Sequence, residues 1–153
     1  MSNMRRKDRE LSRERTLAVI DKCTFSVLAT VNPDGSPYCV PLSMAREEDW
    51  LYFHGSIEGQ KIDNLRYQDK ACVCCVGEVR DLPNVFSIGF ESAIINGKAC
   101  EITDRDEKIH VLKIISKRYT PGNMASFSAA IEKSLAVTSV WKIHIDEMSG
   151  KGK

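Results

Sequence analysis

The stretch from Thr24 to Leu42 reads TFSVLATVNPDGSPYCVPL, and its pattern decides the fold class. The part up to Val31 is rich in β-branched and apolar residues, which favour a strand. Asn-Pro-Asp-Gly follows at positions 32–35 and is typical of a tight turn. The apolar run from Pro37 to Met44 then predicts the returning strand of a β-hairpin.

Pro41 interrupts the returning strand. A proline cannot donate a hydrogen bond to a sheet ladder, so it marks an edge strand, a bulge or a gap that faces a ligand. Backbone groups beside Pro41 would be free to bond a planar heterocycle, although an ordinary edge strand explains the proline equally well. The sequence leaves these alternatives open.

The rest of the chain continues this pattern. Further strands are predicted at Trp50–His54, Ala71–Val76, Phe86–Ile102, where Gly89 and Gly97 are possible bulges, and Ala136–Ile145. Helices are predicted after Ser12, around Ile62 and Leu65, from Asp104 to Thr120 and at about Ala125–Lys133. Six or seven strands joined mostly by short turns predict a mainly β protein, an antiparallel small barrel with peripheral helices.

The length and charge of the chain exclude several function classes. Its 153 residues match the usual size of one domain, which we expect to span 1–153 with mobile ends at 1–10 and 149–153. Lys and Arg number 22 against 21 Asp and Glu, so a net charge of +1 predicts no general attraction to nucleic acid or to a membrane. A mixed-charge start without an apolar signal-peptide core favours a cytoplasmic location.

The six cysteines allow two interpretations. Cys72, Cys74 and Cys75 lie close together, but their spacing does not match a Cys-x-x-Cys metal clamp. In a strand, the side chains of Cys72 and Cys74 share one face and that of Cys75 points to the other, so the three do not easily converge on one ion. Reduced, buried cysteines are favoured over a metal site, and no metal is expected.

A strand that ends in His54 leads into a glycine-bearing turn and a helix. The segment from His54 to Lys61 reads HGSIEGQK and would bring backbone N–H groups, the Ser56 hydroxyl and the Lys61 cation around one point. A helix N-terminus with a nearby cation suits a phosphate. An ordinary strand-to-helix connection with a surface lysine explains the same residues equally well, because a glycine-rich loop without a full consensus is a weak signal.

These segments, together with others in the same order, resemble the FMN-binding split barrels related to pyridoxamine 5′-phosphate oxidase. The chain is most similar to the branch that includes the nitroimidazole-resistance proteins. The matching motifs are Met4–Glu10, Leu28–Thr30, Gly35–Leu42, Leu51–Ser56 with Gly59 and Lys61, Phe90–Ala99, Lys117–Pro121, Trp141–Ile145 and Ser149–Lys151. Each motif is weak alone, but the ordered set covers almost the whole chain and is fairly specific.

The resemblance implies a six-stranded antiparallel split barrel that forms a homodimer, with FMN bound in each of two clefts between the subunits. The cofactor-binding residues that it implies are Val40, Pro41, Leu42, Phe53, His54, Ser56, Lys61, Ser92 and Trp141. By analogy, the first three lie along the isoalloxazine ring, Phe53 and His54 continue that wall, and Lys61 with Ser56 meets the phosphate. Ser92 is implied near the ring, and Trp141 is implied to close the cleft.

Two of these residues keep a structural alternative. His54 at the end of a strand fits a structural histidine as well as a reactive one. Trp141 alternates with Ile143 and Ile145, which suits a core residue as well as a lid.

The resemblance further implies an FMN-dependent oxidoreductase that passes electrons from a reduced nicotinamide to a small organic acceptor such as a nitroaromatic compound or a quinone. The flavin would carry this chemistry, and no catalytic acid–base pair is predicted. The chain lacks the Ser-Arg-Lys clamp and the substrate-binding arginines of the oxidase, so pyridoxamine phosphate is not the expected substrate. The alternative is a non-catalytic module that binds flavin or haem for storage or sensing.

Overall fold

The structure is a computed structural model that describes residues 4–153. Its strands are β1 (Ser26–Val31), β2 (Pro37–Leu42), β3 (Ala45–Glu47), β4 (Trp50–Ser56), β5 (Lys70–Asp81), β6 (Ile88–Glu101), β7 (Thr138–His144) and β8 (Glu147–Gly152). Its α-helices are α1 (Arg13–Lys22), α2 (Gln60–Tyr67), α3 (Arg105–Tyr119) and α4 (Phe127–Ser134), and its short 3-10 turns are η1 (Lys7–Arg9), η2 (Pro121–Ser126) and η3 (Leu135–Val137). Each strand pairing in this described part of the chain is antiparallel.

The predicted hairpin is confirmed as β1 and β2. In its turn, Gly35 has a φ of 84°, a conformation that favours glycine. The Asp34 carboxylate accepts a hydrogen bond of 2.9 Å from the backbone N–H of Ser36 and so closes the turn. β2 is the first strand in the sheet order, and its Pro41 pairs with Val27 of β1. The proline therefore marks an edge strand.

The sheet runs in the order β2-β1-β5-β6-β7-β4-β3, with β8 also paired to β6. The long strand β6 belongs to both halves of this sheet. Its residues Glu91–Asn96 pair with β8, and Ala99–Glu101 pair with β7. The two ends of the order, β2 and β3, do not pair, so the barrel stays open on that side.

Helices α1 and α3 begin at their predicted capping residues. Ser12 accepts a hydrogen bond from the backbone N–H of Arg15 at the start of α1, and Asp104 does the same for Glu107 at the start of α3. Pro121 follows the end of α3, as predicted. Over residues 4–153, no helix combines the length and the apolar character needed to cross a membrane.

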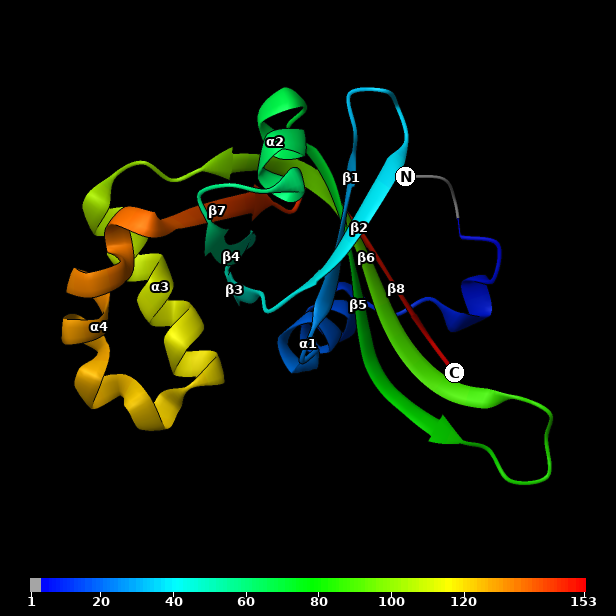
Figure 1. Cartoon of the computed structure of the whole chain (residues 1–153). Helices are drawn as coiled ribbons and strands as arrows, with labels where there is room; N and C mark the ends of the chain where they lie inside the picture. Colours follow the sequence, from blue (N-terminus) through cyan, green and yellow to red (C-terminus); the bar gives the residue numbers. More distant parts are fainter. Residues whose placement is uncertain (1–3) are drawn as a thin grey trace.

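Two apolar clusters stabilise the fold. The larger one fills the barrel and includes α1 and the inward side chains of β1, β4, β5 and β7, among them Leu28, Phe53, Val73 and Ile143. The smaller one joins α3 and α4 to the outer side of β4 and β7. Figure 1 shows α3 and α4 together at one side of the molecule, away from the β1–β2 hairpin.

The strand count and the predicted loose tail are wrong in detail. The described residues form eight strands rather than six, because the short β3 and the C-terminal β8 were not predicted. The tail at 149–153 is therefore not a mobile end: Ser149, Gly150 and Lys151 pair with β6. At the other end, Glu10 bridges to Lys151, whereas residues 1–3 lie outside the described part.

β5 and β6 continue past their neighbours as a two-stranded arm. β1 begins at Ser26, opposite Cys75, so β5 has no partner on that side beyond this point. The bulge lies in β5 between Val76 and Val79 rather than at the glycines of β6. Figure 1 shows the arm extending away from the rest of the chain. Its exposed apolar side chains are Val76, Val79, Val85, Phe86 and Ile88.

Gly97 allows β6 to approach the end of β7. A Cβ atom at this position would overlap the carbonyl oxygen of His144, and both groups belong to paired backbone that cannot easily shift. We expect Gly97→Ala to lower the free energy of unfolding by about 1–3 kcal/mol, measured by urea titration. Gly122→Ala is the matched control, because no atom lies within 4 Å of its added Cβ. Equal midpoints for the two variants would contradict this close approach.

Candidate functional site

The opening of the barrel lies between β2 and β4. β3 pairs with β4 only over Trp50–Tyr52, so the same edge of β4 is open from Phe53 to Ser56. The connection at residues 43–44 joins β2 to β3, and the two open edges diverge from it. We call this opening the split.

Helix α2 spans the far end of the split. Asn64, which is 2% exposed, donates hydrogen bonds to Thr30 Oγ1 at 3.0 Å and to Asn32 Oδ1 at 2.9 Å. The Gln60 side chain donates to the same Asn32 oxygen at 2.9 Å. These bonds tie α2, which follows β4, to the β1–β2 hairpin, and Figure 1 shows α2 beside β1. These polar contacts, of which the Asn64–Thr30 bond is buried, therefore fix the position of α2 relative to the β1–β2 hairpin at this end of the split.

This polar network is not evident from the amino-acid sequence. Asn64 was the available signal, since it lies between Ile62 and Leu65 in the buried part of an amphipathic helix. A buried amide needs hydrogen-bond partners, but the sequence does not say where they are.

Lys61 lies at the start of α2, close enough to His54 at the end of β4 for its positive charge to lower the pKa of the imidazole. A Cβ atom on Gly55 would lie 3.1 Å from Lys61 Cε and 3.2 Å from Nζ, so the lysine side chain lies over the glycine of β4. Lys61 makes no ion pair within the described residues. Gly59, with a φ of 122°, precedes the helix, whose first N–H groups have no intrahelical acceptor. The predicted phosphate site lies at this junction of β4 and α2, which we call the corner. It has a cation and free backbone donors.

Ser56 lies at the edge of this corner. Its hydroxyl accepts a hydrogen bond of 3.3 Å from the backbone N–H of Glu58. Its carbonyl oxygen accepts one of 2.7 Å from the Ser139 hydroxyl, which fixes the end of β4 to β7. The Ser56 hydroxyl keeps its proton available to donate to an anion.

The pKa of His54 is lowered from 6.5, first because of desolvation and second because of the positive charge of Lys61. A lowered pKa means that the folded chain binds a proton less readily than the unfolded chain. Protonation of His54 therefore destabilises the fold progressively as the pH falls below about 6.5. At neutral pH, His54 is therefore an uncharged imidazole at the end of β4.

We expect Lys61→Ala to raise the pKa of His54 back towards 6.5, because it removes the second cause of the shift. The measurement is an NMR titration of the His54 ring protons. Lys113→Ala, at an exposed position of α3, should leave the titration unchanged. An identical His54 midpoint in wild type and Lys61→Ala would show that the lysine charge does not reach the imidazole.

The β2 wall combines apolar packing with an open backbone edge. Val40 and Leu42 are partly buried and pack against the larger apolar cluster. Pro41 points to the other side of the strand and is exposed. The predicted ring-binding residues Val40, Pro41 and Leu42 therefore line one side of the split, with their backbone at its edge.

Phe53 and Trp141 do not join this wall through their side chains. They are 0% and 2% exposed, and their rings stack with centroids 6.3 Å apart at an angle of 7°. The implied role of Trp141 as a lid is wrong for the single chain, because its indole lies inside the barrel, as does the Phe53 ring. The Trp141 Nε1 has no hydrogen-bond partner within the described residues.

Ser92 lies apart from the other predicted residues. It pairs with Val76 of β5 and with Lys151 of β8. Since β1 and β5 separate β6 from β2, roughly 14 Å of sheet lies between Ser92 and the β2 wall, at about 4.8 Å for each strand spacing. A single chain does not bring Ser92 to the split.

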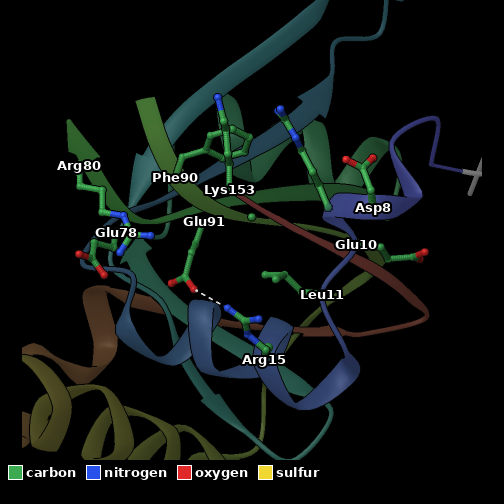
Figure 2. Close-up of a pocket in the computed structure, with 11 residues that line it drawn as sticks. Asp8, Glu10, Leu11, Arg15, Glu78, Arg80, Phe90, Glu91 and Lys153 are labelled. Carbon is green, nitrogen blue, oxygen red and sulfur yellow. Dashed lines mark ion pairs between the residues drawn. The ribbon is translucent and has the colours of Figure 1, made fainter. Parts of the chain in front are cut away.

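A charged cavity of about 290 Å³ lies between the segment before α1 and the ends of β5, β6 and β8 (Figure 2). Its basic lining residues are Arg9, Arg15, Arg80 and Lys153, and its acidic lining residues are Asp8, Glu10, Glu78 and Glu91. Figure 2 shows Arg15 and Glu91 pointing towards each other, and they form an ion pair at 3.5 Å. Equal numbers of opposite charges give this cavity no preference for an anion.

The three clustered cysteines alternate between the faces of β5 as predicted, but the expectation that they are all buried is wrong. Cys75 is buried, whereas Cys72 and Cys74 are half-buried on the other face of β5. Burial is the main cause that raises the pKa of the Cys75 thiol to about 12, so it is not a nucleophile at neutral pH. Residues 4–153 contain no group of three or more His, Cys, Asp or Glu side chains arranged to hold a metal ion.

Comparisons with known proteins agree with this geometry. A family model described as pyridoxamine 5′-phosphate oxidase matches residues 12–152. The chain is 27% identical to a candidate 5-nitroimidazole antibiotic resistance protein from Bacteroides thetaiotaomicron, with a TM-score of 0.78, covering 94% of this chain and 86% of the other. This likeness confirms the predicted split-barrel fold. A comparison with curated proteins gave no match.

Two further solved structures are those of proteins named for their cofactors. An FAD and haem binding protein from Mycobacterium smegmatis is 30% identical, with a TM-score of 0.80, covering 93% of this chain and 71% of the other. The flavocytochrome Anf3 from Azotobacter vinelandii has the same fold at 24% identity, with a TM-score of 0.82, covering 99% of this chain and 72% of the other.

Proposed function

Because the chain belongs to the pyridoxamine 5′-phosphate oxidase family, we propose that it is an FMN-binding oxidoreductase whose cofactor lies in the split. The observation that carries this proposal is the start of α2, where the unpaired Lys61 lies over Gly55 between the two open strand edges. A phosphate at this corner would meet a cation and free N–H groups without requiring a basic surface.

The residues of the split fit the parts of FMN. The Lys61 side chain, the Ser56 hydroxyl and the backbone N–H groups of Gln60 and Lys61 at the start of α2 would hold the phosphate. The Val40–Leu42 segment would contact the ring through apolar side chains and backbone groups, and His54 would lie close by as a neutral imidazole. A bound flavin supplies hydride and single-electron transfer at its ring, while the chain orients it and excludes water.

We propose a homodimer with the cofactor at the subunit interface. Two observations support it: Ser92 is too far from the β2 wall to act within one chain, and exposed apolar side chains extend from the sheet onto the arm. These side chains include Val27, Val76, Val79 and Ile88. Sedimentation should give twice the chain mass of 17.2 kDa, and a monomer that still binds flavin tightly would overturn this part of the proposal.

The proposed reaction passes electrons from a reduced nicotinamide to a small organic acceptor, such as a nitroaromatic compound or a quinone. The likeness to the candidate nitroimidazole-resistance protein supports the acceptor class. Neutral His54 is the one titratable side chain that we place beside the ring. We therefore expect the reaction to depend on the flavin and not on a catalytic acid–base pair.

The second candidate is a non-catalytic module that stores or senses flavin or haem. The likeness at 30% identity to an FAD and haem binding protein favours it specifically. This candidate shares the split with the first and differs only in the absence of turnover.

Absorption spectra of the purified protein distinguish between these two functions. A yellow colour, an oxidised-flavin absorption band and release of FMN, identified by mass after denaturation, would support the flavin site. Bleaching by reduced nicotinamide without oxygen, followed by recovery when a nitroaromatic acceptor is added, would support the oxidoreductase. Flavin that does not bleach would favour the module, and a protein without affinity for any flavin would overturn both flavin proposals.

We also propose a cytoplasmic location. All six cysteines are free, which suits a reducing compartment. Fractionation of the source cells, with immunodetection of the chain, tests this location.

A further inference from the structure

A second cavity, of about 550 Å³, opens on the outer face of the sheet and is distinct from the split. Its lining residues are Ala29, Thr30, Val31, Pro37, Lys70, Ala71, Cys72, Asn96, Gly97, Lys98, Asp146 and Glu147. The volume falls in the range of small-molecule sites, which is about 300–1,000 Å³. None of the residues implied for FMN lines this cavity.

The sheet itself separates the cavity from the split. Thr30 is buried and its hydroxyl accepts from Asn64 on the inner side of β1. Side chains alternate along a strand, so those of Ala29 and Val31 point to the outer side. With Pro37 and Cys72, they form an apolar floor across three neighbouring strands.

Two unpaired cations stand at one end of this floor. Lys70 of β5 and Lys98 of β6 are direct partners across the two strands, both are exposed, and neither makes an ion pair within the described residues. Like charges directly opposite each other destabilise a sheet unless an anion lies between them. An anion at this position would therefore relieve a repulsion that the chain itself leaves in place.

The acidic groups of the cavity are already engaged. The Asp146 carboxylate bonds to His144 Nδ1 at 2.7 Å, and Glu147 has a contact of its own within the chain. The lysine pair is thus the part of the lining that is available to a charged ligand.

We propose that this cavity binds a small anionic molecule with an apolar or aromatic body, whose carboxylate or phosphate lies between Lys70 and Lys98. The apolar floor recognises the body, and the lysine pair recognises the charge. The site is independent of the proposed flavin function, because the two lie on opposite sides of β1. In the proposed dimer, Val27 and Val76 of this face belong to the contact between the subunits, whereas Lys70 and Lys98 lie at the end of β5 and β6 away from the arm.

Amide NMR spectra of the protein as purified test this site with a matched pair of probes. Naphthaleneacetate carries a carboxylate, and naphthaleneacetamide has the same body without the charge. We expect naphthaleneacetate to shift the backbone amide signals of Ala71, Cys72 and Gly97. Naphthaleneacetamide should bind about tenfold more weakly. Naphthyl phosphate, compared in the same way, distinguishes a phosphate from a carboxylate ligand.

Variants separate the lysine pair from general apolar binding. Lys70→Ala with Lys98→Ala should reduce naphthaleneacetate affinity about tenfold, whereas Lys70→Arg with Lys98→Arg should retain it. Lys113→Ala, at an exposed lysine of α3, should bind as wild type does. Equal affinity for the charged and uncharged probes would overturn the proposal. So would shifts confined to the arm, or no shifts at all, the result expected if a second copy covers the cavity.

Discussion

Lys61→Ala is expected to weaken FMN binding by about tenfold to a hundredfold, since a charged hydrogen bond contributes roughly 1.5–3 kcal/mol. The lysine makes no ion pair within the described residues, so its full charge is available to the phosphate. The measurement is fluorescence titration of apoprotein with FMN. Riboflavin, which lacks the phosphate, should bind wild type and variant equally.

Lys61→Arg and Lys113→Ala are the controls for this result. The arginine keeps the charge and should retain most of the affinity, and Lys113 is exposed on α3. An unchanged FMN affinity in a folded Lys61→Ala protein would remove Lys61 from the site. An equal loss for riboflavin would show that the substitution acts through the packing of α2 instead.

Phe53→Ala is expected to lower the free energy of unfolding by about 3–5 kcal/mol, because the ring is fully buried and stacks on Trp141. Urea unfolding followed by circular dichroism measures this change. Phe25→Ala is the matched control, since Phe25 is 62% exposed and its loss should change the stability by less than about 1 kcal/mol.

The same substitution separates a core role from a cofactor role. If Phe53 supports the barrel, apoprotein and flavin-loaded protein should lose similar stability. A loss that appears only in the flavin-loaded protein would show that the ring acts on the cofactor and would contradict the core position described above.

The helices and the central strands were predictable because their signals are local. Ser12 and Asp104 cap the helices that follow them, and the turn at Asn32–Gly35 fixes the first hairpin. These features depend on hydrogen bonds within a few residues, which the sequence shows directly.

β8 was not predictable, because its stability comes from its neighbours. The segment from Glu147 to Gly152 has two glycines and no β-branched residue, which is poor strand sequence. It pairs along its length with β6, and a side chain on Gly150 would collide with Thr16 of α1. The glycines that weaken the local signal are therefore the residues that permit close packing.

The site was predictable in part for the same reason. Lys61 and His54 are close in sequence, and the local turn keeps the lysine charge near enough to act on the imidazole. Asn64 and Thr30 are joined by the fold alone, so their contact could not be predicted. The alternation of Trp141 with Ile143 identified the inward face of β7 but did not distinguish the interior of the barrel from its opening.

The prolines of β2 have a consequence for how the protein behaves at high concentration. An open strand edge invites another chain to extend the sheet, which is the first step of aggregation. Pro37 lies two residues before Cys39 on β2, and Pro41 lies two residues after it. Alternate residues of a strand direct their backbone N–H and C=O groups to the same edge. The outward row of β2 therefore offers a single N–H donor, from Cys39, so the edge can stay open to a small molecule while remaining a poor template for another strand.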